Sequence, residues 1–97
     1  MKTMFSAHPW TSEKTDKSVM AYDIRDKNAR DIGMVWKTSD MSKEELMENV
    51  RLITNAPELL IRAIKLIDAS QQNMPKELVT QAAQELIDCV NVIIGKE

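Results

Sequence analysis

The sequence predicts an α+β fold, in which a small antiparallel β-hairpin or sheet packs against a bundle of about three helices. Two runs of β-branched and aromatic residues flank a polar tract within residues 18–37, which favours paired strands. From residue 42 onward the apolar residues recur at spacings of three and four, which favours helices. Prolines divide this second region into three segments. At 97 residues the chain has room for one domain.

The N-terminal part divides into an arm and a hairpin. Residues 1–17 are polar, include Pro9 and follow neither period, so a loosely ordered arm is expected there. Residues 18–37 form the expected hairpin, with its turn at residues 26–28. Asn28 suits that turn because asparagine tolerates the left-handed backbone conformation.

Residues 42–95 are expected to form the helices. Ser42 and Glu45 have the spacing of a capping box, in which both side chains accept bonds from orphan backbone N–H groups. Pro57 is expected to end the first helix and open the second, Pro75 opens the third, and Gly95 stops it. The core is expected from the residues that share the helical spacing, namely Leu46, Val50, Ile53, Leu60, Ile64, Ile67, Leu86 and Val90.

The composition favours a folded domain of a reducing compartment. The apolar fraction of 43% and the charged fraction of 29% are typical of globular proteins rather than of disordered chains. Cys89 is the one cysteine, so an internal disulfide is excluded. The N-terminus lacks the pattern of a secretory signal, and no apolar run approaches the ~20 residues that span a bilayer. We therefore expect a cytoplasmic protein without membrane contact.

The chain offers few groups for catalysis or for binding a metal or cofactor. His8 is the one histidine, and it lacks a cysteine or a second histidine at metal-ligand spacing. Two glycines are too few for a phosphate-binding loop. A small enzyme or a nucleotide-sequestering protein would need converging polar groups, and the spacing of the arginines does not bring them together: Arg25, Arg30, Arg51 and Arg62. We expect no enzymatic activity and no cofactor.

Acidic residues gather in the middle of the chain. The net charge is −2, and residues 38–58 hold two Lys/Arg against five Asp/Glu. Asp40, Glu44 and Glu48 recur every fourth residue with Glu45 beside them, so on a continuous helix their carboxylates would lie about 6 Å apart, close to the spacing of backbone phosphates. Alternatively, Glu44 and Glu45 serve only the first helical turn, where the helix dipole favours carboxylates. Because basic and acidic residues are interleaved along the chain, direct nucleic-acid binding is not expected.

The segment around Pro57 resembles a motif of short bacteriophage and prophage proteins. Those proteins carry the run Asn-Ala-Arg-Leu-Ile-Ala-Ala-Ala-Pro-Glu-Leu-Leu after a tryptophan-containing N-terminal segment and a β-hairpin. The matching run here is Asn49-Val50-Arg51-Leu52-Ile53-Thr54-Asn55-Ala56-Pro57-Glu58-Leu59-Leu60, preceded by Trp10 and the expected hairpin. The departures are Val50 for alanine, Thr54-Asn55 for Ala-Ala, and Ile61-Arg62 where an acidic or small residue is usual, and the similarity covers residues 10–68.

This resemblance implies a function through the kind of genome that carries such proteins. Phage accessory proteins of this size commonly inhibit host machinery, and several anti-CRISPR proteins are acidic mimics of DNA. We therefore expect a phage- or prophage-encoded inhibitor that acts in the host cytoplasm. Its expected partner is a host protein or ribonucleoprotein complex such as a CRISPR effector, whose DNA binding it blocks. The expected partner-binding residues are Asp40, Glu44, Glu45 and Glu48, with Asp26 and Asp31 of the hairpin as outlying contributors.

The alternative is a self-associating phage structural or regulatory module without a role in defence. Its basis is the last helix, whose apolar band is wider than a two-helix contact needs. The band consists of two adjacent stripes, formed by Leu78, Val79, Ala82, Ala83, Leu86 and Ile87. Either this helix is central in the monomer or it faces a second copy in a homodimer.

Overall fold

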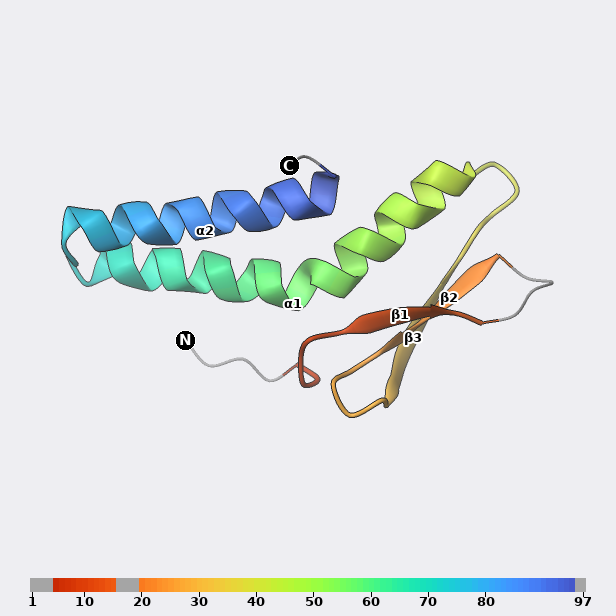
Figure 1. The fold of residues 1–97 in the computed structure, drawn as a ribbon. Coiled ribbons are helices and arrows are strands. Elements are labelled where there is room, and N and C mark those ends of the chain that lie inside the picture. Colours follow the sequence, from red (N-terminus) through yellow and green to blue (C-terminus); the bar gives the residue numbers. More distant parts are fainter. Residues whose placement is uncertain (1–4, 16–19, 96–97) are drawn as a thin grey trace.

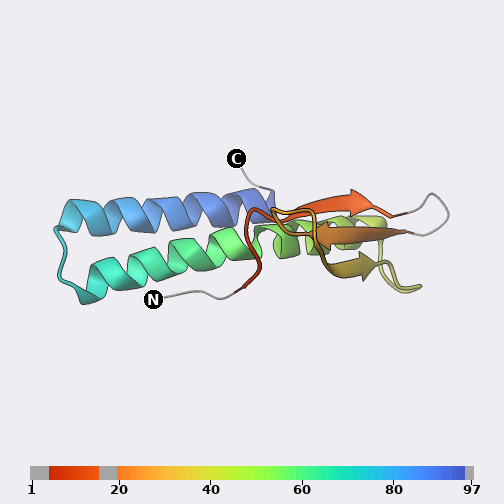
Figure 2. The ribbon, with the colours of Figure 1, turned by 90° about the horizontal axis from the view of Figure 1, so that it is seen from below.

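The computed structural model describes residues 5–15 and 20–95 and confirms the α+β class. Within these residues, three strands form an antiparallel sheet that two helices follow (Figure 1). The elements in chain order are β1 (Thr11–Lys14), β2 (Ala21–Arg25), β3 (Asp31–Trp36), α1 (Lys43–Gln71) and α2 (Lys76–Ile94). The sheet lies at one end and the paired helices extend to the other, so the molecule is elongated, with extents of 53 × 28 × 18 Å (Figure 1 and Figure 2).

The expected hairpin is present as β2 and β3. These strands pair antiparallel from Ala21 opposite Trp36 to Arg25 opposite Asp31. In the turn between them Ala29, rather than the expected Asn28, adopts the left-handed conformation, with a φ of 63°. The carboxylate of Asp26 accepts bonds from the backbone N–H groups of residues 28 and 30 and thereby sets the shape of the turn.

The N-terminal segment differs from the expected loose arm, because Thr11–Lys14 form β1. This strand pairs with β2 along its whole length, from Thr11 opposite Arg25 to Lys14 opposite Tyr22. All four of its residues are exposed, so it has no alternation of apolar and polar side chains that could predict it. Backbone hydrogen bonds to β2 keep β1 in the sheet instead. The expectations for residues 1–4 and 16–19 lie outside the described residues.

The expectation of about three helices is wrong, because α1 continues through Pro57. Proline removes one N–H donor and crowds the preceding turn, so it bends a helix without having to end it. Two side chains just before it donate to carbonyls of that turn: Thr54 Oγ1 to the oxygen of Val50 at 2.9 Å, and Asn55 Nδ2 to that of Arg51 at 2.8 Å. The proline ring itself is buried. The bend directs the first half of α1 along the sheet and the second half along α2 (Figure 1).

Two packing regions result from this bend. At the sheet, Ile24, Leu46 and Val50 form a buried cluster that partly buried side chains surround, Trp10 and Tyr22 among them. Along the helical hairpin, by contrast, the buried apolar residues are mostly small, and they comprise Ala69, Ala82 and Ile93. Three residues of the expected core, Leu60, Ile67 and Val90, are exposed on the hairpin, so that part of the expectation is wrong.

The C-terminal end of α2 is tied to α1. Gly95 takes the left-handed conformation with a φ of 78°, and its N–H reaches the carbonyls of Asn91 and Val92. The predicted stop is therefore present. Arg51 of α1 donates from Nε to the carbonyl oxygen of Ile93 at 2.7 Å. Since the last turn of α2 has no basic residue of its own, Arg51 supplies the positive charge that the helix dipole favours there.

Candidate interaction surfaces

The acidic residues expected to bind a partner lie at the start of α1. Ser42 caps the helix, with Oγ accepting a bond from the N–H of Glu45 at 3.0 Å. Glu44, Glu45 and Glu48 project from the first turns and are exposed. Within the described residues, none of these three carboxylates forms an ion pair, so the negative charge at this end of α1 stays uncompensated.

Asp40 belongs to the same surface but not to the helix. It lies three residues before α1 begins, so the expected row of evenly spaced carboxylates is shortened to Glu44 and Glu48 with Glu45 beside them. The hydroxyl of Thr38 donates to Asp40 Oδ1 at 2.7 Å, and this bond is the main reason that the pKa of Asp40 is lowered. We call these four residues the acidic end: Asp40, Glu44, Glu45 and Glu48.

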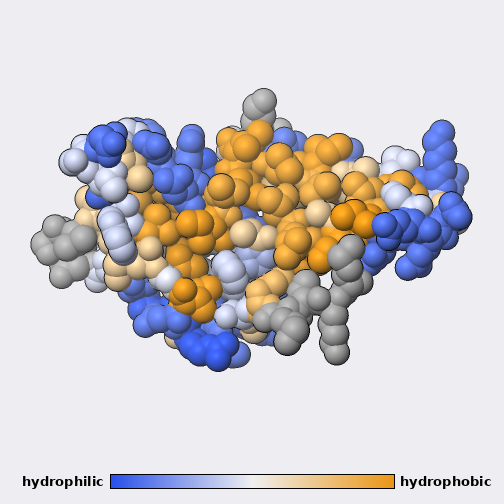
Figure 3. Space-filling view, turned by 180° about the vertical axis from the view of Figure 1, so that it is seen from behind, coloured by the Kyte–Doolittle hydropathy of each residue, from blue (hydrophilic) through white to orange (hydrophobic). Residues whose placement is uncertain are grey.

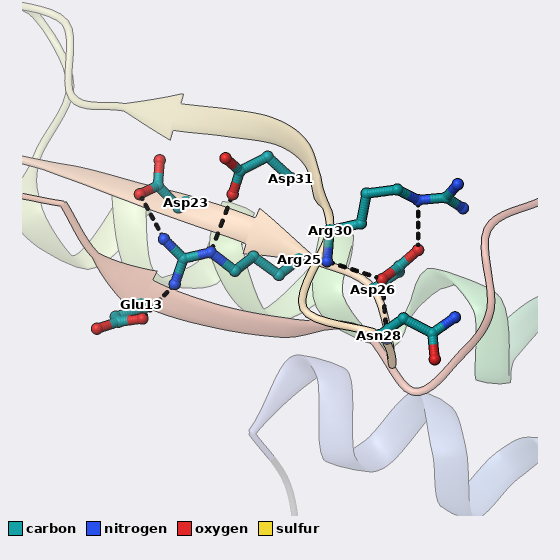
Figure 4. Close-up of polar contacts among 7 residues, drawn as sticks. All are labelled: Glu13, Asp23, Arg25, Asp26, Asn28, Arg30 and Asp31. Carbon is teal, nitrogen blue, oxygen red and sulfur yellow. Dashed lines mark hydrogen bonds and ion pairs between the residues drawn. The ribbon is translucent and has the colours of Figure 1, made fainter.

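Asp26 does not contribute to a contact surface, because its side chain is fully buried in the β2–β3 turn. Its carboxylate accepts bonds from the N–H groups of Asn28 and Arg30 at 2.9 and 3.0 Å, and from Arg30 Nε at 3.0 Å (Figure 4). The bond from the Arg30 N–H, opposed by burial, holds the pKa of Asp26 below its ordinary value of 3.8. The residue stabilises the turn and is not available to a partner.

Asp31 is exposed, but it is already paired with Arg25. The Arg25 guanidinium lies on β2 and joins all three strands, with Nε donating to Asp31 Oδ1 at 2.9 Å (Figure 4). It also pairs with Asp23 on its own strand and with Glu13 on β1. These bonds, that to Asp31 first, raise the pKa of Arg25.

Position also separates Asp31 from the acidic end. It begins β3, a strand of six residues that spans about 20 Å. The chain reaches α1 only after the far end of that strand, so the turn and the acidic end lie at opposite ends of the sheet (Figure 1 and Figure 2).

A second candidate surface runs along the helical hairpin and consists of apolar side chains. Seen from behind, hydrophobic residues gather over both helices (Figure 3). Six large apolar residues exposed on α1 and α2 share one side of the hairpin by helical spacing, and they are between 38% and 53% exposed. They are Leu52, Leu60, Ile67, Ile87, Val90 and Ile94. We call this side of the hairpin, with the residues that lie between these six, the apolar face.

The opposite side of the hairpin carries ion pairs in its middle and an apolar hollow near the loop that joins the helices. Glu85 of α2 accepts from Lys65 at 2.8 Å and from Arg62 at 3.2 Å, and Arg62 also pairs with Glu58 at 2.8 Å. The bond from Lys65 is the main reason that the pKa of Glu85 is lowered. Cys89 lies near this network, where burial raises the pKa of its thiol. A thiol that stays protonated at neutral pH is a poor nucleophile.

Open hollows accompany both sides of the hairpin. Near the loop that joins the helices, a hollow of 620 Å³ has apolar walls with Lys65 and Asp68 at its margin. At the other end of α2, Leu52 and Ile94 line the same shallow hollow, which places the two helices' exposed apolar residues next to each other. The described part of the chain contains no group of three or more His, Cys, Asp or Glu residues that could hold a metal ion.

No protein-family model matches this chain, no curated protein matches it, and no solved structure resembles its fold closely enough to count as a match. Neither α1 nor α2, as far as these helices are described, is both long and apolar enough to cross a membrane. The chain itself offers two candidate surfaces, the acidic end and the apolar face. The sequence pointed to the acidic end directly, whereas it placed three of the six residues that define the apolar face in the core, namely Leu60, Ile67 and Val90.

Proposed function

We propose that this protein acts by binding another protein, and that the acidic end makes the contact. The observation that supports this is that three exposed carboxylates without an ion pair to any described residue gather in the first turns of one helix. Glu13, Asp31, Glu58 and Glu85 of the sheet and the hairpin are paired with arginine or lysine, and the exposed acids of α2 that form no ion pair within the described part of the chain, Glu77 and Asp88, lie eleven residues apart. Glu44, Glu45 and Glu48 have no such counterion among the described residues, so an external basic surface can serve as one.

The partner we propose is a basic nucleic-acid-binding channel of a host defence complex, such as a CRISPR effector. Carboxylates one turn apart on a rigid helix stand in for phosphates in such a channel, and long-range attraction speeds the encounter. The resemblance of residues 49–60 to phage proteins supports this choice of partner. Asp26 and Asp31 are left out of the proposed contact, because the first is buried in a turn and the second is paired with Arg25.

A capture experiment with charge-reversed baits tests this proposal. Tagged wild-type protein and the double variant Glu44→Lys/Glu48→Lys are used to capture proteins from a lysate of a CRISPR-bearing bacterium. The expected result is a nucleic-acid-binding complex that only the wild type retains and that duplex DNA displaces. Glu77→Lys is the matched control, since Glu77 occupies the first turn of α2 and is also exposed.

Capture should weaken with added salt, because exposed charges are screened beyond about 8 Å at physiological ionic strength. Circular dichroism must show that the double variant keeps its helices. Retention of the same complex by the folded double variant would exclude the acidic end as the contact. The alternative expectation is a self-associating phage structural or regulatory module without a role in defence, and it would be favoured if neither bait retained such a complex.

A further inference from the structure

We propose that the apolar face is the interface of a homodimer, in which two helical hairpins pack face to face into a four-helix bundle. The spacing of apolar residues along the two helices defines this face. On α1 the residues on this side follow steps of three and four, and they are Leu52, Ala56, Leu59, Leu60, Ala63 and Ile67. On α2 the same steps give Val79, Ala83, Leu86, Ile87, Val90 and Ile94. Such alternating steps form the seam along which helices of bundles and coiled coils pack.

The two stripes lie on the same side of the hairpin. Arg62 and Lys65 of α1 meet Glu85 of α2 on the opposite side. At 100° per residue, each apolar stripe lies roughly opposite these paired residues on its own helix. The shared hollow of Leu52 and Ile94 shows that the stripes adjoin at one end. The result is one continuous face across both helices, as Figure 3 shows.

The hairpin needs a further layer to bury its apolar side chains. A stable domain packs at least two layers around a core, and two helices side by side leave both of their outer faces in water. Of the 19 residues of α2, only Ala82 and Ile93 are buried. The sheet does not cover the hairpin, because it packs on the first half of α1 (Figure 1). Among residues 5–15 and 20–95 no element covers this side of the hairpin, so a second copy can supply the missing layer.

The area of the molecule allows such an interface. The chain exposes 7041 Å², whereas a compact protein of its 11.1 kDa exposes about 5,700 Å². Its radius of gyration is 16.0 Å, against about 12.5 Å for a compact chain of this length. A stable dimer buries about 800 Å² on each partner. The excess surface, about 1,300 Å² by the same scaling, is enough to supply that area.

The chemistry of the face favours a second copy over a foreign protein. The twelve residues of the face are all apolar, and the charged residue that borders them in the hollow of Leu52 and Ile94 is Glu48, at one end of the face. Interfaces of homodimers are more apolar than those of transient complexes and resemble a core divided in half. A two-fold axis also brings the same apolar stripes together from both chains, and alanines at 56, 63 and 83 leave room for larger side chains of the partner.

Light scattering after size-exclusion chromatography tests the proposal on the full chain. At 100 µM the wild type is expected at twice 11.1 kDa. Ile87→Lys, which places charges in the interface, is expected to give a helical monomer. The matched control is Val92→Lys, because Val92 is an equally exposed apolar residue of the same helix, 57% against 50%, on the side of the ion pairs. The control is expected to remain a dimer.

Two outcomes of this experiment overturn the proposal. A monomeric wild type at 100 µM excludes the dimer, and a dimeric Ile87→Lys shows that a different surface associates. If Ile87→Lys does not fold, the uncharged Ile87→Ser is measured instead, and its dissociation constant is expected to rise at least tenfold. An unchanged constant would exclude this face. In addition, the melting temperature of the wild type should rise with chain concentration, because association stabilises the folded state by mass action.

Discussion

The sheet end and the helical hairpin solve the same packing problem in different ways. At the sheet end, strand and helix enclose Ile24, Leu46 and Val50 completely, with half-buried aromatic residues around them. In the hairpin, equally apolar sequence remains exposed along a whole face. Both regions show the same helical period, and α1 runs through both of them. An amphipathic period therefore predicts that a face becomes buried, but it does not predict whether the same chain or a partner buries it.

The largest expected effect is a difference in stability between two leucine substitutions in α1, one in each region. Leu46 is 0% exposed and Leu60 is 45% exposed. Leu46→Ala should lower the free energy of unfolding by about 2 to 5 kcal/mol, because it leaves a cavity in a closed core. Leu60→Ala should lower the free energy of unfolding much less in dilute solution, where no second copy covers the apolar face. Its effect should grow as the protein concentration rises.

Urea denaturation of both variants at low and high protein concentration measures this pair. The comparison fails if Leu60→Ala is as destabilising as Leu46→Ala at the lowest concentration. The hairpin would then contain a closed core of its own, and it would not need a second copy to cover the apolar face.

A smaller effect is expected at Gly95, where Arg51 of α1 contacts the C-terminal end of α2. Gly95→Ala puts a Cβ at a φ of 78° and 3.4 Å from Nη2 of Arg51, the side chain that caps α2. Left-handed backbone in a non-glycine residue costs about 1 to 2 kcal/mol, so thermal unfolding should occur at a lower temperature. Gly33→Ala is the matched control, since nothing lies within 4 Å of the added Cβ. Equal melting temperatures for the two variants would contradict this account of the α2 terminus.

The smallest effect at neutral pH concerns Asp26, which belongs to the sheet end. Its pKa is lowered in the folded chain, so its ionised form adds stability that is complete above the ordinary value of 3.8. As pH falls below 3.8 the unfolded chain takes up a proton first, and the contribution is lost as pH passes through the folded-state pKa. Urea denaturation between pH 5 and pH 2 should therefore show a weaker pH dependence for Asp26→Asn than for the wild type. Identical dependence would mean that another carboxyl group is responsible.

Local signals in the sequence determined several features of this protein correctly. The hairpin of β2 and β3 follows from two apolar runs around a polar tract, and Ser42 caps α1 as its spacing predicts. Gly95 ends α2 for the same local reason, the freedom of glycine at positive φ. The exposure of Glu44 and Glu48 also follows from the helical period alone. Each of these depends on residues within one or two turns of each other, which is the range over which a sequence pattern carries information.

The tertiary structure alone decided the rest. α1 continues through Pro57, whose ring is buried, and helical spacing within the sequence does not reveal that burial. β1 forms from exposed polar residues because β2 offers it backbone partners. Asp26 is buried because its carboxylate accepts hydrogen bonds from backbone N–H groups of the β2–β3 turn. Leu60, Ile67 and Val90 are exposed because the sheet covers only the first half of α1, and helical spacing does not reveal which half a distant sheet will cover.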